Sequence, residues 1–283
     1  MSIEFPRRIR RVAFQGELGA FSHLAILKLV GSKAKPVPCQ RFEQLFTAVI
    51  EGKADAAMLP VENTLHGSVH ENYDLLLQYR LPIVAETNVR IVHNLIANPG
   101  VKFRDIRKVY SHPVALNQCL EFFKRNPQAE KAAWYDTAGS IKMLAEEKPE
   151  GAAGIASSLA AATYGCEILK AGIEDDRQNY TRFFLLAKKP IPFRSPPHGY
   201  KTSLAVTMPN VPGSLFRVLA ALALRDISLC KLETRPWKGR RWEYLFYIDF
   251  LGDVREERVA NALRHLGEVT DSLVVLGCYP RGD

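Results

Sequence analysis

The sequence has few cysteines and no long apolar run, and these two absences narrow the class of protein. Its 283 residues include five cysteines, an odd number, and none of them has the Cys-x-x-Cys spacing of zinc sites. No stretch of about 18 apolar residues is present, so we expect no membrane-spanning helix. The first 11 residues are basic and lack the apolar core of a secretory signal. We therefore predict a protein of the reducing cytoplasm that carries neither a disulfide framework nor a metal.

Nucleic acid is not an expected partner, although the formal net charge is +8. Basic residues form no single block beyond the N-terminus, and the basic-aromatic interleaving of RNA-binding proteins is missing. A helix-turn-helix or similar reader is not evident either. We interpret the positive charge as a solvated surface that attracts small anions.

A proline-rich segment, residues 188–200, divides the chain into two predicted domains. Over residues 10–188, strand and helix signals alternate, which predicts an α/β domain with parallel sheets and crossover helices. Residues 201–280 follow the order β-α-β-β-α-β of a ferredoxin-like domain, with a turn expected at residues 236–241. The length agrees with two domains, since about 150 residues per domain is usual.

Polar residues follow several predicted strands of the first domain and precede its predicted helices. The residues expected to cap these helices are Ser68, Ser111, Asp136 and Ser157. The helix after Ser111 is expected to continue to Phe123, because apolar residues recur at helical spacing. In open α/β sheets, helix N-termini meet beyond the carboxyl ends of the strands, and their free N–H groups bind anions. The pattern thus predicts an anion-binding cleft that needs no metal.

Seven short motifs follow one another along the chain in a fixed order. Those of the first domain are residues 14–22 (FQGELGAFS), 59–64 (LPVENT) with 67–69 (GSV), 111–119 (SHPVALNQC), 136–139 (DTAG) and 179–183 (NYTRF). Those of the second domain are residues 210–215 (NVPGSL) and 233–236 (ETRP). Together they resemble the prephenate dehydratases that carry a C-terminal ACT domain. The resemblance implies a two-lobed catalytic domain, like that of periplasmic binding proteins, and a regulatory ferredoxin-like ACT domain.

The resemblance also implies a reaction. The family removes carboxylate and hydroxide from prephenate, and the products are phenylpyruvate, carbon dioxide and water. Such an enzyme must hold a dianion and must donate a hydrogen bond or a proton to the departing ring hydroxyl. It needs no electron sink, metal or nucleophile, so we expect no cofactor. The absence of a GxSxG nucleophile motif agrees with this expectation.

Thr181 is the residue that the resemblance implies as essential. A threonine hydroxyl is too weakly acidic to act alone as a strong acid, so we expect it to donate a hydrogen bond as negative charge develops on the leaving oxygen. His112 titrates near neutral pH and is an alternative proton donor. Arg182 is expected either to pair with a substrate carboxylate or to form a structural ion pair.

Four further residues complete the expected catalytic site. Asn63, Ser111 and Gln118 are neutral groups suited to orient carboxylate and carbonyl oxygens. Ser111 and Gln118 are about two helical turns apart, so both can face the same side. Glu62 would repel a dianion unless it is protonated or paired, and we expect it either to act behind the residues that touch substrate or to be an acid with a raised pKa.

In the second domain the resemblance implies a site for L-phenylalanine, which would inhibit by favouring a less active arrangement. The expected contacts are Asn210, Pro212, Gly213, Ser214, Leu215, Glu233 and Thr234. The turn at 210–214 opens a helix whose N–H groups can receive a carboxylate. Leu215 would be an apolar contact, and Glu233 would face the ammonium group. Because ACT domains pair, we expect a homodimer or a homotetramer.

Two alternatives stay open. An arogenate dehydratase would perform the same chemistry on the aminated substrate. A non-catalytic module that binds small anions would share the two-lobed architecture, because fold alone does not give function.

Overall fold

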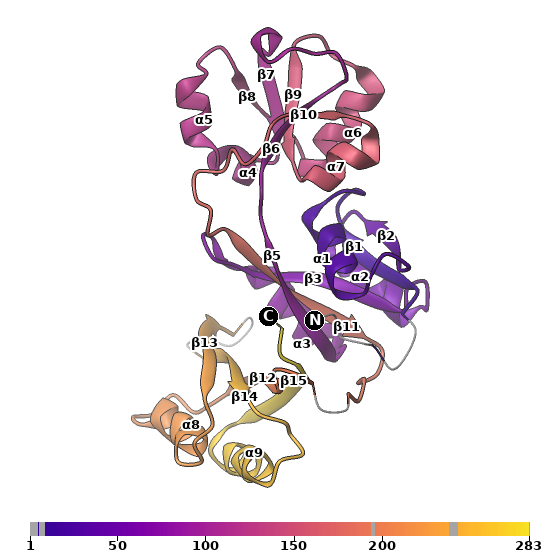
Figure 1. The fold of residues 1–283 in the computed structure, drawn as a ribbon. Helices are drawn as coiled ribbons and strands as arrows, with labels where there is room; N and C mark the ends of the chain where they lie inside the picture. Colours follow the sequence, from indigo (N-terminus) through magenta and orange to yellow (C-terminus); the bar gives the residue numbers. More distant parts are fainter. Residues whose placement is uncertain (1–4, 6–8, 194–195, 238–242, 283) are drawn as a thin grey trace.

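The computed structural model describes residues 5, 9–193, 196–237 and 243–282, and these form three sheets (Figure 1). The first sheet has the order β2-β1-β3-β11-β5, with β4 beside β3. Its strands are β1 (Arg11–Gln15), β2 (Lys35–Cys39), β3 (Ala56–Asn63), β4 (Gly67–Ser68), β5 (Ile83–Arg90) and β11 (Tyr180–Ala187). Its helices are α1 (Phe21–Leu29), α2 (Phe42–Ile50) and α3 (His70–Tyr79). These elements form the first lobe.

The second lobe is built on the sheet β10-β6-β9-β7-β8. Its strands are β6 (Asn94–Ala97), β7 (Lys108–Ser111), β8 (Glu130–Ala133), β9 (Ala152–Ala156) and β10 (Glu167–Lys170). Its helices are η1 (Phe103–Asp105), α4 (Pro113–Asn117), α5 (Leu120–Arg125), α6 (Thr137–Glu147) and α7 (Ser158–Tyr164). Figure 1 shows the two lobes one above the other, joined by extended chain that continues β5 and leads into β11. The predicted two-lobed α/β architecture is therefore confirmed.

Both sheets are mixed, so the prediction of parallel sheets is wrong. Strand β1 is parallel to β2 and β3, but β11 is antiparallel to both β3 and β5. In the second lobe β7 is parallel to β8 and β9, whereas β6 is antiparallel to β9 and β10. The reason is the path of the chain, which leaves the first lobe after β5 and returns to it in the opposite direction as β11.

The two connections between the lobes run side by side. The backbone N–H of Ile91 donates to the carbonyl of Asn179 at 2.8 Å, and that of Ile173 donates to the carbonyl of His93 at 2.8 Å. The lobes also share buried apolar side chains, since Ile26 of α1 belongs to the same cluster as Ile141 of α6. The two lobes therefore pack as one body around the crossing segments.

Two of the four predicted helix caps are confirmed. The Asp136 carboxylate accepts from the N–H of Gly139, and the Ser157 hydroxyl accepts from the N–H of Ala160. Ser68 is not a cap, because it lies in β4 and Val69 precedes α3.

The predicted helix after Ser111 differs in two ways. His112 is the residue that caps α4, and the helix stops after Asn117. A new helix, α5, begins at Leu120, whose N–H donates to the Asp175 carboxylate at 2.7 Å. Asp175 lies 55 residues away, so the helical spacing of the local sequence did not reveal this second start.

The C-terminal part has the predicted β-α-β-β-α-β order. Its sheet is β13-β14-β12-β15, with strands β12 (Tyr200–Thr207), β13 (Leu229–Pro236), β14 (Tyr244–Leu251) and β15 (Ser272–Pro280). Its helices α8 (Ser214–Ala223) and α9 (Glu257–Val269) share a buried cluster with the sheet. Residues 238–241 of the predicted turn lie outside the described residues. No helix in the described part of the chain is both long and apolar enough to span a membrane.

The C-terminal sheet packs directly against the first lobe. Tyr73 of α3 and Tyr247 of β14 are buried with their ring centroids 4.6 Å apart. Gly277 of β15 lies so close to β5 that a Cβ atom on it would be 2.4 Å from the carbonyl oxygen of Ile83. One buried apolar cluster therefore includes residues of both units.

Candidate active site

A cleft of about 500 Å³ lies between the two lobes. Both lobes and the segments that join them contribute to its walls. Four of the predicted catalytic residues line it, namely Thr181, Asn63, Gln118 and His112. It is also lined by His93 and Asp136, which we did not predict as catalytic. The structure thus brings together residues from all five first-domain motifs, and Asn63 and Thr181, which meet there, are 118 positions apart.

Thr181 and Asn63 are paired across β11 and β3. Asn63 Nδ2 donates to Thr181 Oγ1 at 3.0 Å and to Asn179 Oδ1 at 2.8 Å. Asn63 Oδ1 accepts from the backbone N–H groups of Leu65 and His66 at 2.9 and 3.0 Å. Both ends of the Asn63 amide therefore form hydrogen bonds within the protein, and its nitrogen positions Thr181. Since Thr181 accepts a hydrogen bond, its own hydroxyl hydrogen stays available to the cleft.

Three residues of the second lobe reach the cleft from the ends of helices α4 and α6. Gln118 ends α4, and its Oε1 lies 2.6 Å from His93 Nε2. His112 begins α4, where its Nδ1 accepts from the N–H of Val114 at 3.3 Å. Asp136 begins α6, and burial raises its pKa. The DTAG motif pointed to Asp136 only as a helix cap, and no motif pointed to His93.

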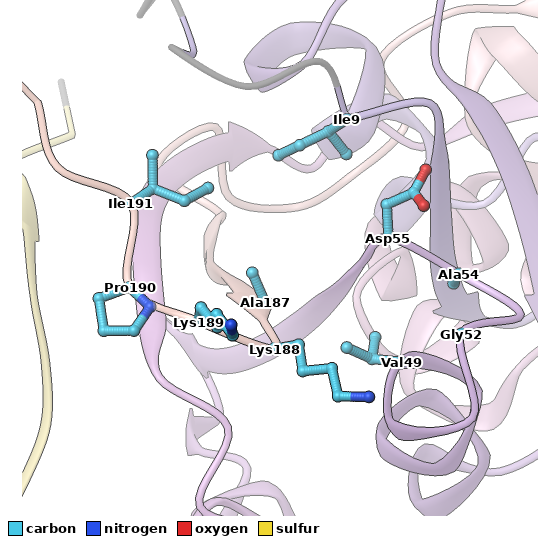
Figure 2. A pocket seen from close by; sticks show the side chains of 10 residues that line it. All are labelled: Ile9, Val49, Gly52, Ala54, Asp55, Ala187, Lys188, Lys189, Pro190 and Ile191. Atoms are coloured by element: carbon cyan, nitrogen blue, oxygen red, sulfur yellow. The ribbon is translucent and has the colours of Figure 1, made fainter.

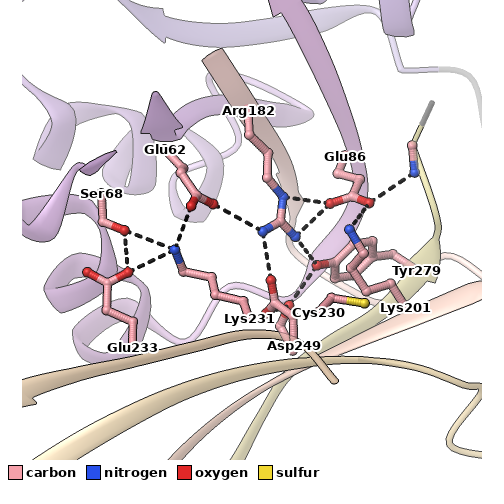
Figure 3. Close-up of polar contacts among 12 residues, drawn as sticks. Glu62, Ser68, Glu86, Arg182, Lys201, Cys230, Lys231, Glu233, Asp249 and Tyr279 are labelled. Atoms are coloured by element: carbon pink, nitrogen blue, oxygen red, sulfur yellow. Dashed lines mark hydrogen bonds and ion pairs between the residues drawn. The ribbon is translucent and has the colours of Figure 1, made fainter. Parts of the chain in front are cut away.

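Arg182 and Glu62 do not lie in the cleft, although we predicted them as catalytic. Arg182 Nη2 is 2.6 Å from Glu86 Oε2, and its Nη1 is 2.7 Å from Asp249 Oδ2 (Figure 3). Glu62 is 3.0 Å from Lys231 Nζ. The reason is the two-residue period of a strand, which turns neighbours of Thr181 and Asn63 toward the opposite face. Arg182 therefore forms structural ion pairs, which is one of the two alternatives that the sequence left open.

Ser111 is also placed away from the cleft. It is fully buried at the end of β7, and its hydroxyl donates to the carbonyl of Ile155 in β9 at 2.6 Å. Our expectation that Ser111 and Gln118 share one helical face is wrong, because the helix begins only at Pro113. Ser111 joins two strands of the second lobe instead.

The glycine-rich segment of the first motif contacts the second lobe. Gly19 has φ +90°, and a Cβ atom on it would lie 2.6 Å from the Cα atom of Ala160 in α7. Its carbonyl accepts from the Ser157 hydroxyl at 2.6 Å. Gly19 thus permits a close approach between the lobes at the entrance to α1.

A second cavity, of about 370 Å³, lies at the other end of β11 (Figure 2). Its wall includes Lys188 and Asp55. Lys188 Nζ donates to the carbonyl of Ile50 at 3.1 Å, and Asp55 is ion-paired with Arg11 at 3.1 Å. Because these charges already have partners, this cavity offers less to a ligand than the cleft at Thr181.

The predicted effector residues surround the start of α8. Gly213 precedes this helix with φ +82°, and the buried Ser214 hydroxyl has no partner among the described residues. Asn210, Pro212 and Leu215 are exposed.

Glu233 departs from its predicted place. Its carboxylate lies 2.8 Å from Lys231 Nζ and 3.2 Å from His70 Nδ1, and it accepts from the Ser68 hydroxyl. It therefore faces the first lobe and already has the cationic partner Lys231 within its own chain, so our expectation that it faces an effector ammonium is wrong. Thr234, its neighbour, is exposed on β13.

Comparison with known proteins gives the family. The family model described as "Prephenate dehydratase" matches residues 12–191, more than half of the chain. The chain belongs to this family. It is therefore an enzyme of the dehydratase type, a carbon–oxygen lyase of aromatic amino acid biosynthesis.

Curated relatives extend the similarity over nearly the whole chain. "Arogenate dehydratase/prephenate dehydratase 2, chloroplastic" of Arabidopsis thaliana is 43% identical over 279 residues, which cover 95% of this chain and 72% of the relative. "Arogenate dehydratase 2" of Petunia hybrida is 42% identical over 285 residues, with 95% and 71% covered. Several Arabidopsis relatives are named as chloroplastic, and this contradicts the cytoplasmic location that we predicted.

Two solved structures match the fold as well as the sequence. A prephenate dehydratase from Arthrobacter aurescens in complex with L-Phe has a TM-score of 0.86 and 32% identity, with 96% of this chain and 90% of that chain covered. A structure described as GqqA, a novel type of quorum quenching acylases, has a TM-score of 0.88 and 34% identity, with 96% and 98% covered.

Proposed function

We propose that this chain converts prephenate to phenylpyruvate in the cleft between its lobes, with Thr181 at the centre of the reaction. The observation that carries the proposal is the Thr181 hydroxyl, which accepts from Asn63 Nδ2 at 3.0 Å and keeps its hydrogen for the cleft. As the carboxylate leaves as carbon dioxide, its bonding electrons move into the ring and the bond to the ring hydroxyl breaks. The departing oxygen gains negative charge, and Thr181 donates a hydrogen bond to it.

The hydroxide must also receive a proton to leave as water. His112 is the candidate donor in this proposal, because it lines the cleft and, since its Nδ1 accepts from the N–H of Val114, its ring hydrogen is carried by Nε2. Asp136 faces the same cleft, and burial raises its pKa, which keeps it closer to its neutral form. Neither residue needs to be a strong acid if Thr181 stabilises the charge first.

The dianion is expected to bind at neutral donors and helix N-termini. The starts of α1 and α6 both contribute to the cleft wall, through Phe21 and Thr137. Free N–H groups at such starts, together with the positive end of the helix dipole, favour carboxylates. The side-chain amide of Gln118 adds a donor from α4.

Arogenate is the alternative substrate, because relatives at 42–43% identity are named as arogenate dehydratases. Purified protein should be incubated separately with prephenate and with arogenate, and the products identified by chromatography. Phenylpyruvate from prephenate supports the proposal, and phenylalanine from arogenate alone would replace it. Binding of either compound without turnover would indicate a binding module instead.

We also propose that residues 10–188 form the catalytic domain and residues 201–280 an ACT domain that binds L-phenylalanine at the start of α8. The support is a helix N-terminus opened by Gly213 and the hydroxyl of the buried Ser214, which has no partner in the part of the chain that the structure describes. A related structure is described as a complex with L-Phe. Inhibition would require that the effector binds one arrangement of the enzyme more tightly than another.

A homodimer or homotetramer is part of the same proposal. Within the described sheet, β13 pairs on one side only, with β14. Leu229 and Leu232 of this edge strand are 39% exposed, an apolar edge that a second copy can cover. Light scattering coupled to size-exclusion chromatography would give the mass, and a monomer would refute this part of the proposal.

A further inference from the structure

His93 is a buried residue of the candidate active site that no sequence motif indicated. It lies in the segment that leaves the first lobe after β5, is 2% exposed, and contributes to the cleft wall. Its Nε2 is 2.6 Å from Oε1 of Gln118, at the end of α4. A hydrogen bond therefore joins the crossing segment to a second-lobe side chain within the cleft.

The direction of this hydrogen bond follows from the other ring nitrogen. His93 Nδ1 is buried and has no hydrogen-bond partner among the described residues. Burial lowers the pKa of His93, so the ring is neutral near pH 7 and carries a single N–H. If that hydrogen were on Nδ1, a buried donor would have no acceptor, which is costly and rare. The hydrogen is therefore on Nε2, and it is donated to Gln118 Oε1.

This arrangement determines what Gln118 presents to the cleft. An amide has one accepting and one donating end. Because its oxygen is occupied by His93, its NH2 group is the end that remains for the substrate. A flipped amide would place an oxygen toward the dianion and would repel it.

We infer that His93 is a positioning residue that fixes the Gln118 amide so that its N–H donors face the substrate anion. This inference rests on the proposed function, because it assigns His93 to the binding of the same dianion. His93 acts through Gln118 and makes no bond in the reaction itself.

The backbone of His93 is held firmly enough for this role. Its N–H donates to Glu174 Oε2 at 3.0 Å, and its carbonyl accepts from Ile173 at 2.8 Å. Glu174 is itself fixed by Arg90, whose Nη2 is 2.9 Å from Oε1. The edge of the His93 ring meets Phe21, with centroids 5.6 Å apart and an interplanar angle of 81°.

The segment that contains Glu174, which returns from the second lobe to the first, also holds Gln118. The N–H of Asp175, next to Glu174, donates to the backbone carbonyl of Gln118 at 2.8 Å. Consecutive residues of the segment that returns to the first lobe therefore fix both ends of the His93–Gln118 contact. Rigid support of this kind is what a precisely oriented binding group needs.

A double-mutant cycle tests the inference. His93→Leu removes the donor, His93→Gln keeps an N–H near the position of Nε2, and Gln118→Ala removes the group being positioned. We expect His93→Leu to lower kcat/KM for prephenate by about 10-fold or more, mainly through KM, since hydrogen bonds to charged groups have this effect. His93→Gln should recover most of the loss. In the Gln118→Ala background, His93→Leu should cause no further loss.

Two results of this cycle would overturn the inference. One is an equal loss from His93→Leu with and without Gln118, which would indicate a general structural role. The other is a His93→Gln variant that is folded, by urea titration, but as impaired as His93→Leu.

A measurement that does not depend on turnover separates this inference from the proposed function. In protein labelled with 15N-histidine, the ring shifts of His93, assigned with His93→Gln, should be those of a neutral ring protonated at Nε2. Gln118→Ala should change these shifts. A ring protonated at Nδ1 would refute the inference even in an active enzyme, whereas an inactive wild type with the Nε2 tautomer would refute only the proposed function.

Discussion

Thr181 and Arg182 are consecutive residues of β11 whose side chains serve opposite faces of one sheet. The Thr181 hydroxyl is 3.0 Å from Asn63 Nδ2 at the cleft, whereas Arg182 Nη1 is 2.7 Å from Asp249 Oδ2 of the C-terminal sheet. The same is true of β3, where Asn63 serves the cleft and Glu62 pairs with Lys231. On the face away from the cleft, β3 and β11 therefore both form ion pairs with the C-terminal sheet (Figure 3).

Replacing Thr181 by alanine should lower kcat by about 10²- to 10³-fold, the usual effect of removing one donor to a developing negative charge. Thr181→Ser keeps the hydroxyl and should retain most of the activity. The measurement is the initial rate of phenylpyruvate formation from prephenate. Near-normal kcat in a folded Thr181→Ala variant would remove Thr181 from the mechanism.

Breaking the contact between Arg182 and Asp249 should destabilise the protein. Asp249 is 4% exposed and also accepts from the Ser203 hydroxyl at 2.6 Å. Asp249→Asn leaves the buried Arg182 charge with fewer partners, so we expect the free energy of unfolding to fall by about 3 kcal/mol. Urea unfolding followed by fluorescence would measure this change.

The matched control for Asp249→Asn is an ion pair at the surface. Lys53 lies 2.7 Å from Glu51, and both side chains are more than half exposed. Lys53→Gln should leave the urea midpoint unchanged, because exposed pairs contribute little. Equal effects of the two substitutions would mean that the network between the domains is not a source of stability.

Glu86 should make stability depend on pH in the acid range. Burial alone would raise its pKa, but Arg182 and Lys201 lower it below the ordinary value of 4.5. A carboxylate with a lower pKa in the folded state stabilises the protein above its unfolded pKa, and this contribution is lost as the pH falls through the folded pKa. Below about pH 4.5, wild type should therefore lose its advantage over Glu86→Gln.

Urea titrations of both proteins from pH 7 down to about pH 3 would test this prediction. The quantity to compare is the difference in unfolding free energy between wild type and Glu86→Gln. A difference that stays constant down to the lowest pH would show that the Glu86 pKa is not coupled to folding.

Adding a methyl group at the contact between β15 and β5 should destabilise the protein. A Cβ atom on Gly277 would lie 2.4 Å from the Ile83 carbonyl oxygen and 2.8 Å from the Ile83 Cβ atom. We expect Gly277→Ala to lower the free energy of unfolding by about 1–3 kcal/mol, the usual cost of overpacking. Gly267→Ala is the control, because nothing lies within 4 Å of its added Cβ atom in α9. That control should be neutral or slightly stabilising.

L-Phenylalanine should stabilise the protein by mass action if it binds at the start of α8. At a concentration 100 times Kd the gain is about 2.7 kcal/mol. Ser214→Ala should weaken binding, measured by calorimetry, because the buried hydroxyl has no other partner among the described residues. Unchanged binding in this variant would place the effector elsewhere.

Much of the fold could be predicted from local patterns. The proline-rich segment separated the two parts, and the β-α-β-β-α-β order of the second part matched its strands and helices. The caps at Asp136 and Ser157 were predicted because they satisfy N–H groups within the same turn. The directions of the strands could not be predicted in this way, because β11 joins the first sheet only after the chain has formed the second lobe.

The family, the order of the motifs and the expectation of a catalytic role for Thr181 could all be read from the sequence. Which motif residues reach the cleft depends on the folded chain, since Glu62 and Asn63 differ by one position and face opposite ways. The pairing of β11 with β3 also shifts its register between Arg182 and Phe183, and no local pattern in the sequence indicates this shift. His93 and Gln118 are 25 positions apart, and the segment that returns to the first lobe holds both, through Glu174 and Asp175. Contacts of this kind depend on long-range packing, which local periodicity does not encode.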